Sequence, residues 1–128
     1  MSRHAVLLIA HGSKDPTWKR PFEVIADTLA QRFDGPVVLS FLESARPSVA
    51  EGWASLLQPG VDRITVVPLF LAAGSHVRTD IPQLIAQAQG QHPQVTWEIL
   101  PALGALPHLQ QAIASAVVTQ LQQEKTRP

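Results

Sequence analysis

Four short apolar runs, each followed by a segment with helical spacing, constrain the fold more than any other feature of this chain. The runs span residues 5–10, 37–42, 64–71 and 95–100, and the helical segments span 21–33, 49–57, 81–89 and 109–122. Short runs rich in Val, Ile, Leu and Phe predict strands. A strand–helix pattern repeated four times predicts an α/β fold, a single-domain doubly wound parallel four-stranded sheet flanked by helices.

The composition of the runs predicts where each strand lies in the sheet. The first and third runs are almost continuously apolar, which is typical of central strands covered on both faces. The fourth run contains Thr96 and Glu98 in alternation with apolar residues, which favours an edge position. A strand order that begins 2-1-3 would place the first and third strands side by side.

Three helix starts carry recognisable signals. Ser48 and Glu51 have the spacing of a capping box, and Pro107 suits the first turn of the last helix. Asp80 is expected to cap a helix that begins just ahead of Pro82, because proline is best tolerated at the start of a helix.

Composition excludes several classes of function. A chain of 128 residues with 45% hydrophobic content predicts one domain over residues 1–128. Ten basic residues balance ten acidic ones, which gives no general reason to expect nucleic acid or an anionic membrane as partner. The absence of cysteine excludes disulfides and thiolate metal sites. The first apolar run is too short for a signal peptide or a membrane span, so a cytoplasmic location is expected.

Two histidines and a glutamate follow three of the predicted strands. His11 comes after the first strand, Glu43 after the second and His76 after the third. Ligands of open parallel sheets bind beyond the carboxyl ends of the strands, where these three side chains would meet. Imidazole and carboxylate suit cobalt, nickel, iron or zinc, and they also accept protons near neutral pH. The alternative is that each histidine is only a polar residue at the start of a loop.

Small residues flank both histidines. Gly12 and Ser13 follow His11, and Gly74 and Ser75 precede His76. Glycine lets the backbone approach a bulky ligand closely, although turn geometry would equally explain both glycines. These four residues are therefore candidate ligand-binding positions.

Basic residues gather in the loops of the same predicted rim. They are Lys14, Lys19, Arg20, Arg46 and Arg78. Arginine forks suit a substrate with several carboxylates, so Arg46 and Arg78 are candidate substrate contacts, with ordinary solvated surface as the alternative. His4 and His92 are expected to be solvated, and His108 is interpreted as a residue of the last helix start.

Three sequence blocks resemble one known family. They are His11-Gly-Ser-Lys-Asp-Pro, Phe-Leu-Glu43 and the segment 68–82, Pro-Leu-Phe-Leu-Ala-Ala-Gly-Ser-His-Val-Arg-Thr-Asp-Ile-Pro. Together they resemble the small class II chelatases of the CbiX type, and the resemblance extends over nearly the whole chain to Gly104. The third block is the most specific, whereas His-Gly-Ser alone would be weak.

The resemblance implies a sirohydrochlorin chelatase. Such an enzyme inserts cobalt into sirohydrochlorin for cobalamin synthesis, and relatives insert iron for siroheme or nickel for a methanogenic cofactor. The divalent metal ion is then a substrate, and no organic cofactor is expected. The family's metal-binding histidines map onto His11 and His76, and its acidic partner maps onto Glu43. Because larger members contain two such units, the resemblance also implies a homodimer with the tetrapyrrole near its interface.

Two other functions use the same residues. A non-catalytic metal or tetrapyrrole carrier could bind through the same histidines without turnover. A phosphoryl-transfer enzyme of the histidine phosphatase kind also has His-Gly after its first strand, but Ala10 stands where that signature has arginine. If histidines bind the metal, activity should fall below about pH 6.5, where an ordinary imidazole becomes protonated.

Overall fold

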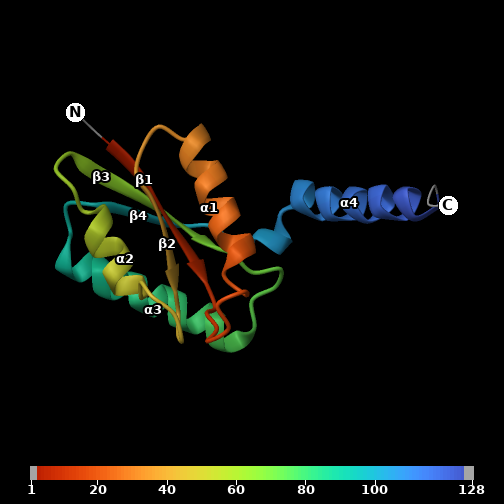
Figure 1. Cartoon of the computed structure of the whole chain (residues 1–128). Coiled ribbons are helices and arrows are strands. Elements are labelled where there is room, and N and C mark those ends of the chain that lie inside the picture. The colour runs from red at the N-terminus through yellow and green to blue at the C-terminus, as the bar shows by residue number, and fades with distance from the viewer. Residues whose placement is uncertain (1–2, 126–128) are drawn as a thin grey trace.

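The chain forms a four-stranded parallel sheet with the order β2-β1-β3-β4 (Figure 1). The computed structural model describes residues 3–125, apart from the side chain of His76. The strands are β1 (Arg3–Ala10), β2 (Val37–Phe41), β3 (Val61–Pro68) and β4 (Thr96–Ile99). The predicted parallel sheet, the 2-1-3 start and the edge position of the fourth strand are confirmed. The predicted end of the third strand at 71 is wrong, because β3 ends at Pro68.

Within residues 3–125, four α-helices and one short 3₁₀ helix connect and follow the strands. They are α1 (Arg20–Arg32), α2 (Val49–Leu56), α3 (Ser75–Gln91), η1 (Leu103–Ala105) and α4 (Pro107–Lys125). The predicted start of α3 near residue 81 is wrong, and so is the cap assigned to Asp80. Gly74 is the N-cap, and the Arg78 N–H already donates to its carbonyl at 3.0 Å. Pro82 therefore lies inside the helix, where its missing N–H removes one backbone hydrogen bond.

The alternation of side chains along the strands divides the core between two faces. Leu7, Ile9 and Ile64 point to the face covered by α2 and α3, where Trp53 and Trp97 meet edge to face with ring centroids 6.2 Å apart. On the other face, Val6, Leu8 and Val67 pack with α1 residues such as Ala26 and Leu29.

His4 also lies on the α1 face and is not solvated as expected. Its Nε2 lies 2.7 Å from Thr65 Oγ1, and its ring packs edge-on against Phe33 at a centroid distance of 5.3 Å. The position follows from strand alternation, because residues 4, 6 and 8 of β1 share one face. His4 is therefore a structural residue of the sheet.

The C-terminal helix α4 leaves the body of the molecule. Figure 1 shows it running away from the sheet, with its far end well separated from every other element. None of its described residues is buried, and its contacts within the chain are chiefly with η1. The periodicity of the sequence predicts a helix here but does not indicate what covers it.

The predicted capping box at the start of α2 is confirmed. Ser48 Oγ accepts from the Glu51 N–H at 3.1 Å, and Glu51 Oε1 accepts from the Ser48 N–H at 2.9 Å. The Arg46 guanidinium donates to the same carboxylate. The Arg46 hydrogen bond, assisted by the Ser48 N–H, lowers the pKa of Glu51 from 4.5 to about 2.

Replacing Glu51 with Gln should flatten the acid limb of the stability profile. A carboxyl whose pKa is depressed on folding stabilises the native state above its unfolded pKa, and this stabilisation is lost as pH falls from about 4.5 to about 2. Because the group is exposed, the effect is small. Urea unfolding of wild type and Glu51→Gln at pH 7, 4 and 2.5 measures it. If the free energy of unfolding changed equally with pH in the two proteins, Glu51 would not be the group with the lowered pKa.

Candidate functional site at the carboxyl ends of β1 and β2

The backbone places His11 and Glu43 side by side. His11 is the first residue after β1, and Glu43 follows β2 by two residues. The Leu42 N–H donates to the Ala10 carbonyl at 3.0 Å, and the Glu43 N–H donates to the His11 carbonyl at 3.0 Å. These bonds continue the parallel ladder beyond the strands. The two side chains are thus held at the predicted rim by main-chain contacts.

The two side chains form a polar pair that solvent can reach. His11 Nε2 lies 2.8 Å from Glu43 Oε1, and the side chains are 49% and 62% exposed. The His11 ring also lies edge-on to Phe70, with centroids 6.5 Å apart. An imidazole that lies beside a carboxylate and an aromatic ring can bind a cation or pass a proton while it remains open to substrate.

Gly12 makes the close approach of the two loops possible. Its φ is +110°, and a Cβ at this position would lie 1.7 Å from the Glu43 carbonyl oxygen. Only glycine fits such a backbone and such a distance. The contact with the neighbouring loop therefore accounts for Gly12. By contrast, nothing lies within 4 Å of a Cβ built on Gly74.

A polar hollow of about 350 Å³ lies between this rim and α3. Its lining consists of His11, Leu42, Glu43, Asp80, Gln83, Leu84 and Gln87. The α3 side chains of this hollow were not among the site residues predicted from the sequence. Their signal is the spacing of Asp80, Gln83 and Gln87, which places three polar residues on one helical face once the helix is known to begin at Ser75.

His76 is the second residue of α3, one helical turn before Asp80. Its side chain lies outside the described part of the structure, so the pairing of His11 with His76 stays a prediction. Among the residues whose side chains are described, no group of three or more His, Asp or Glu is close enough to hold a metal ion.

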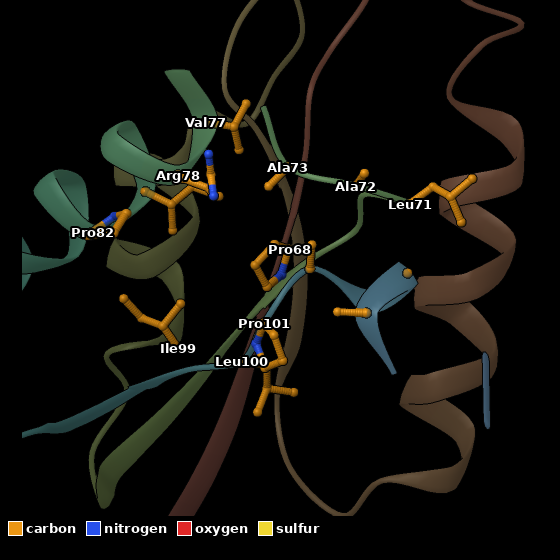
Figure 2. Close-up of a pocket in the computed structure, with 14 residues that line it drawn as sticks. Pro68, Leu71, Ala72, Ala73, Val77, Arg78, Pro82, Ile99, Leu100 and Pro101 are labelled. Atoms are coloured by element: carbon orange, nitrogen blue, oxygen red, sulfur yellow. The ribbon is translucent and has the colours of Figure 1, made fainter. Parts of the chain in front are cut away.

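A second, apolar hollow of about 510 Å³ borders the same end of the sheet. Figure 2 shows Val77, Arg78 and Pro82 of α3 on one side, with Pro68, Leu100 and Pro101 at the strand ends opposite. Its other lining residues are Leu71, Ala72, Ala73, Ile81, Ile99, Ala102, Gly104 and Ala105. Arg78 thus lies at an apolar surface next to the candidate site.

The other predicted binding residues are not among those that line the hollow beside the His11–Glu43 pair. Arg46 lines a separate hollow of about 330 Å³ between α1 and β2, and its guanidinium pairs with Glu51. Ser13 Oγ accepts from the Asp15 N–H at 3.1 Å, and Ser75 is the first residue of α3. The binding roles predicted for these residues, for Gly74 and for Arg78 stay predictions.

The remaining histidines lie away from the site. His92 is the C-cap of α3, at the end of the helix opposite Ser75. His108 lies in the first turn of α4 and is exposed, as expected for a helix start. Within residues 3–125, no helix combines the length and the apolar character that crossing a membrane requires.

Comparison with known proteins relates the whole arrangement to one family. The CbiX family model matches residues 5–120. A sirohydrochlorin cobaltochelatase of Methanothermobacter thermautotrophicus is 40% identical over 90 residues, which cover 68% of this chain and 63% of that protein. The match thus spans less than two thirds of the length of that curated relative.

Two crystal structures show the same fold. One is a CbiX protein of Marinobacter aquaeolei, described as putative in cobalamin biosynthesis, with a TM-score of 0.86 and 34% identity over 97% of this chain and 99% of that chain. The other is the sirohydrochlorin chelatase SirB of Bacillus subtilis subspecies spizizenii in complex with cobalt, with a TM-score of 0.71 and 27% identity over 77% of this chain and 43% of that chain. The chain belongs to the CbiX family.

Proposed function

We propose that this protein is a metal chelatase, a lyase that inserts a divalent metal ion into sirohydrochlorin. The observation that carries the proposal is the half-exposed pair of His11 and Glu43 at the carboxyl ends of adjacent strands, with 2.8 Å between Nε2 and Oε1. The cobaltochelatase name of the relative and the cobalt in the SirB complex support cobalt as the metal, with iron and nickel as alternatives.

His11 supplies the ligand atom for the incoming ion. A neutral imidazole binds metal through a ring nitrogen without a proton, so the competent tautomer carries its proton on Nδ1. Ligand atoms at about 2.1 Å from one ion lie about 3.0–3.4 Å apart, depending on geometry. Because Nε2 and Oε1 start 2.8 Å apart, a small outward movement lets both contact the same ion. His76, the second residue of α3, is the proposed second imidazole ligand.

Glu43 is the proposed proton acceptor. Metal insertion replaces two pyrrole N–H protons of the macrocycle with one divalent ion, so a base must remove the protons at the face where the ion enters. The Glu43 carboxylate is next to the metal-binding nitrogen and is 62% exposed, which allows it to pass the protons to water. Metal delivery and proton removal then occur at one pair of side chains.

The two hollows give the macrocycle a place beside this pair. Both share α3, with Asp80 in the polar hollow and Arg78 in the apolar one. A flat ring with apolar faces and peripheral carboxylates suits an apolar surface of about 510 Å³ bordered by one arginine. We assign the carboxylate contact to Arg78. The loops that contain Gly12, Ser13, Gly74 and Ser75 would border the ring.

The proposed assembly is a homodimer in the cytoplasm, built from two copies of one domain. The lengths of the two related chains support the dimer. The matched segment covers nearly all of the Marinobacter protein but less than half of the SirB chain, so the SirB chain is long enough to hold two such units. A two-unit chain and a pair of single-unit chains would present the tetrapyrrole with equivalent surroundings.

Visible absorption spectroscopy of sirohydrochlorin tests the function. The protein is mixed with excess sirohydrochlorin and Co²⁺, Fe²⁺ or Ni²⁺ in turn, and the spectral change is followed against the uncatalysed rate. Acceleration over many turnovers, fastest with Co²⁺, is expected. One equivalent of bound tetrapyrrole or metal without turnover would instead identify a carrier. No acceleration with any of the three ions would refute the chelatase.

A further inference from the structure

The imidazole of His11 lies beside one side chain from each of the two adjacent strands. Glu43, beyond the end of β2, has its Oε1 atom 2.8 Å from Nε2, and Phe70, beyond the end of β3, lies edge-on to the imidazole with ring centroids 6.5 Å apart. A carboxylate can bind metal and accept a proton, whereas a phenyl ring can do neither. The contact with Phe70 is therefore unchanged by the chemistry that the proposed function assigns to Glu43.

The register of the sheet places Phe70 beside His11. Ile9 of β1 is paired with Pro68 of β3, and the Leu69 N–H donates to the Ile9 carbonyl at 2.8 Å. Side chains two residues further along each strand lie on the same face of the sheet. Phe70 accordingly packs against the core on the α2 and α3 face, where it is half-buried. The contact between the two rings thus follows from the pairing of β1 with β3.

A residue of η1 holds the main chain of Phe70 in place. The Gly104 N–H donates to the Phe70 carbonyl at 3.1 Å. A Cβ on Gly104 would lie 1.5 Å from the Leu71 carbonyl oxygen and 2.7 Å from the Leu71 Cα. Only a residue without a Cβ permits this approach. The position of Phe70 therefore depends on a glycine that lies far from His11 in the sequence.

The His11 ring needs a restraint of this kind because its own torsion does not provide one. The torsion about Cβ–Cγ of histidine has a broad energy profile, and the side chain is 49% exposed to solvent. A half-turn about this bond puts Cε1 where Nε2 had been, so a carbon atom then faces Glu43. The Glu43 carboxylate opposes this rotation only until it contacts the metal ion or takes up a pyrrole proton.

We propose that Phe70 is a positioning residue whose ring keeps His11 Nε2 directed at the incoming ion, and that Gly104 keeps Phe70 in place. The inference rests on the proposed function for the identity of the ion, whereas the restraint is a property of the metal-free protein. A ligand held in one orientation loses less freedom when it binds, so the affinity for metal depends on this restraint.

NMR relaxation of the metal-free protein tests the restraint directly. Histidine is labelled with ¹³C at Cε1, and the His11 signal is assigned by its loss in His11→Ala. Phe70→Leu keeps an apolar side chain but removes the ring, so the order parameter of His11 should fall from about 0.85 to below about 0.6. Phe70→Tyr retains the ring and should restore the wild-type value. An imidazole as rigid in Phe70→Leu as in wild type would overturn the proposal.

Two further variants separate the restraint from general stability. Leu57 belongs to the same group of partly buried apolar residues as Phe70 but lies at the C-terminal end of α2, so Leu57→Ala should lower stability and leave the order parameter of His11 unchanged. Gly104→Ala should lower the order parameter, whereas Gly90→Ala, with nothing within 4 Å of its Cβ, should not. Circular dichroism reports whether each variant is folded. Equal order parameters in Gly104→Ala and Gly90→Ala would remove Gly104 from the proposal.

Titration with Co²⁺ in the absence of tetrapyrrole measures the consequence for binding. Phe70→Leu and Gly104→Ala should raise the dissociation constant of Co²⁺ about 2- to 10-fold, and Leu57→Ala should leave it unchanged. In the insertion assay, Phe70→Leu should raise the KM for Co²⁺ by the same factor without changing the KM for sirohydrochlorin. An unchanged Co²⁺ affinity in Phe70→Leu would overturn the proposal. A protein that shows the restraint and the change in affinity but inserts no metal would uphold it while refuting the proposed function.

Discussion

Replacing His11 with alanine is expected to lower the rate of cobalt insertion at least about 100-fold, which is the low end of effects for a group that takes part directly in the chemistry. The variant loses the Nε2 atom that faces Glu43 and leaves the backbone hydrogen bonds of the rim in place. Its fold should therefore be unchanged. The visible absorption assay gives the rate, and unfolding in urea checks the fold.

Two companion variants separate metal binding from proton removal. Glu43→Gln retains a hydrogen-bonding side chain at the same distance but has no carboxylate, so kcat should fall more than the affinity for metal. His108→Ala removes an exposed imidazole in the first turn of α4 and should leave the rate unchanged. A His11→Ala protein as fast as the His108→Ala protein would remove His11 from the mechanism.

Replacing Gly12 with alanine is expected to lower the free energy of unfolding by about 2–4 kcal/mol. The φ of +110° is strained for any residue with a Cβ, and that Cβ would lie 1.7 Å from the Glu43 carbonyl oxygen. The two loops must separate to accommodate it. Because the separation also moves Glu43 away from His11, the insertion rate should fall together with stability.

Gly90 provides the matched control for this substitution. It lies in α3 with nothing within 4 Å of an added Cβ, so alanine should raise the free energy of unfolding by about 0.5–1 kcal/mol. Urea unfolding of both variants measures the contrast. If Gly12→Ala and Gly90→Ala had equal stability, the close contact at Gly12 would not constrain the loops.

Local sequence patterns predicted the strands because the apolar or polar character of a strand's residues indicates how deeply that strand is buried. The continuous apolar run of β1 indicated a central strand, and Thr96 and Glu98 indicated the edge position of β4. The position of His11 and Glu43 followed from the same reasoning, because parallel strands share one carboxyl edge. Their contact at 2.8 Å required only that β1 and β2 be neighbours.

Predictions failed where a local signal competed with packing. Pro82 resembles a helix start, but α3 begins at Ser75. Val77 and Ile81 are both buried, so burial stabilises the turn before Pro82 as part of the helix. The mistaken boundary hid the polar face that contains Gln83 and Gln87. The prediction that His4 is solvated was wrong because its hydrogen bond with Thr65 joins residues far apart in sequence, which leaves no local signal.

Residue spacing alone does not show which surface covers α4 or which side chain pairs with Arg46. An apolar helical pattern predicts a buried face but does not say which chain supplies the cover. Arg46 pairs with Glu51, whose side chain had been assigned only to the capping box, and the predicted contact of Arg46 with substrate stays a prediction.

The main-chain bonds between the β1 and β2 loops divide the site into two independently adjustable halves. Since the Glu43 N–H is bonded to the His11 carbonyl, replacement of side chains on α3 leaves the separation of those two residues unaltered. Gln83 and Gln87 are the α3 side chains through which the lining of the hollow can change while the backbone positions of His11 and Glu43 are kept. Under the proposed function, redesign for a different ion should begin with these two positions.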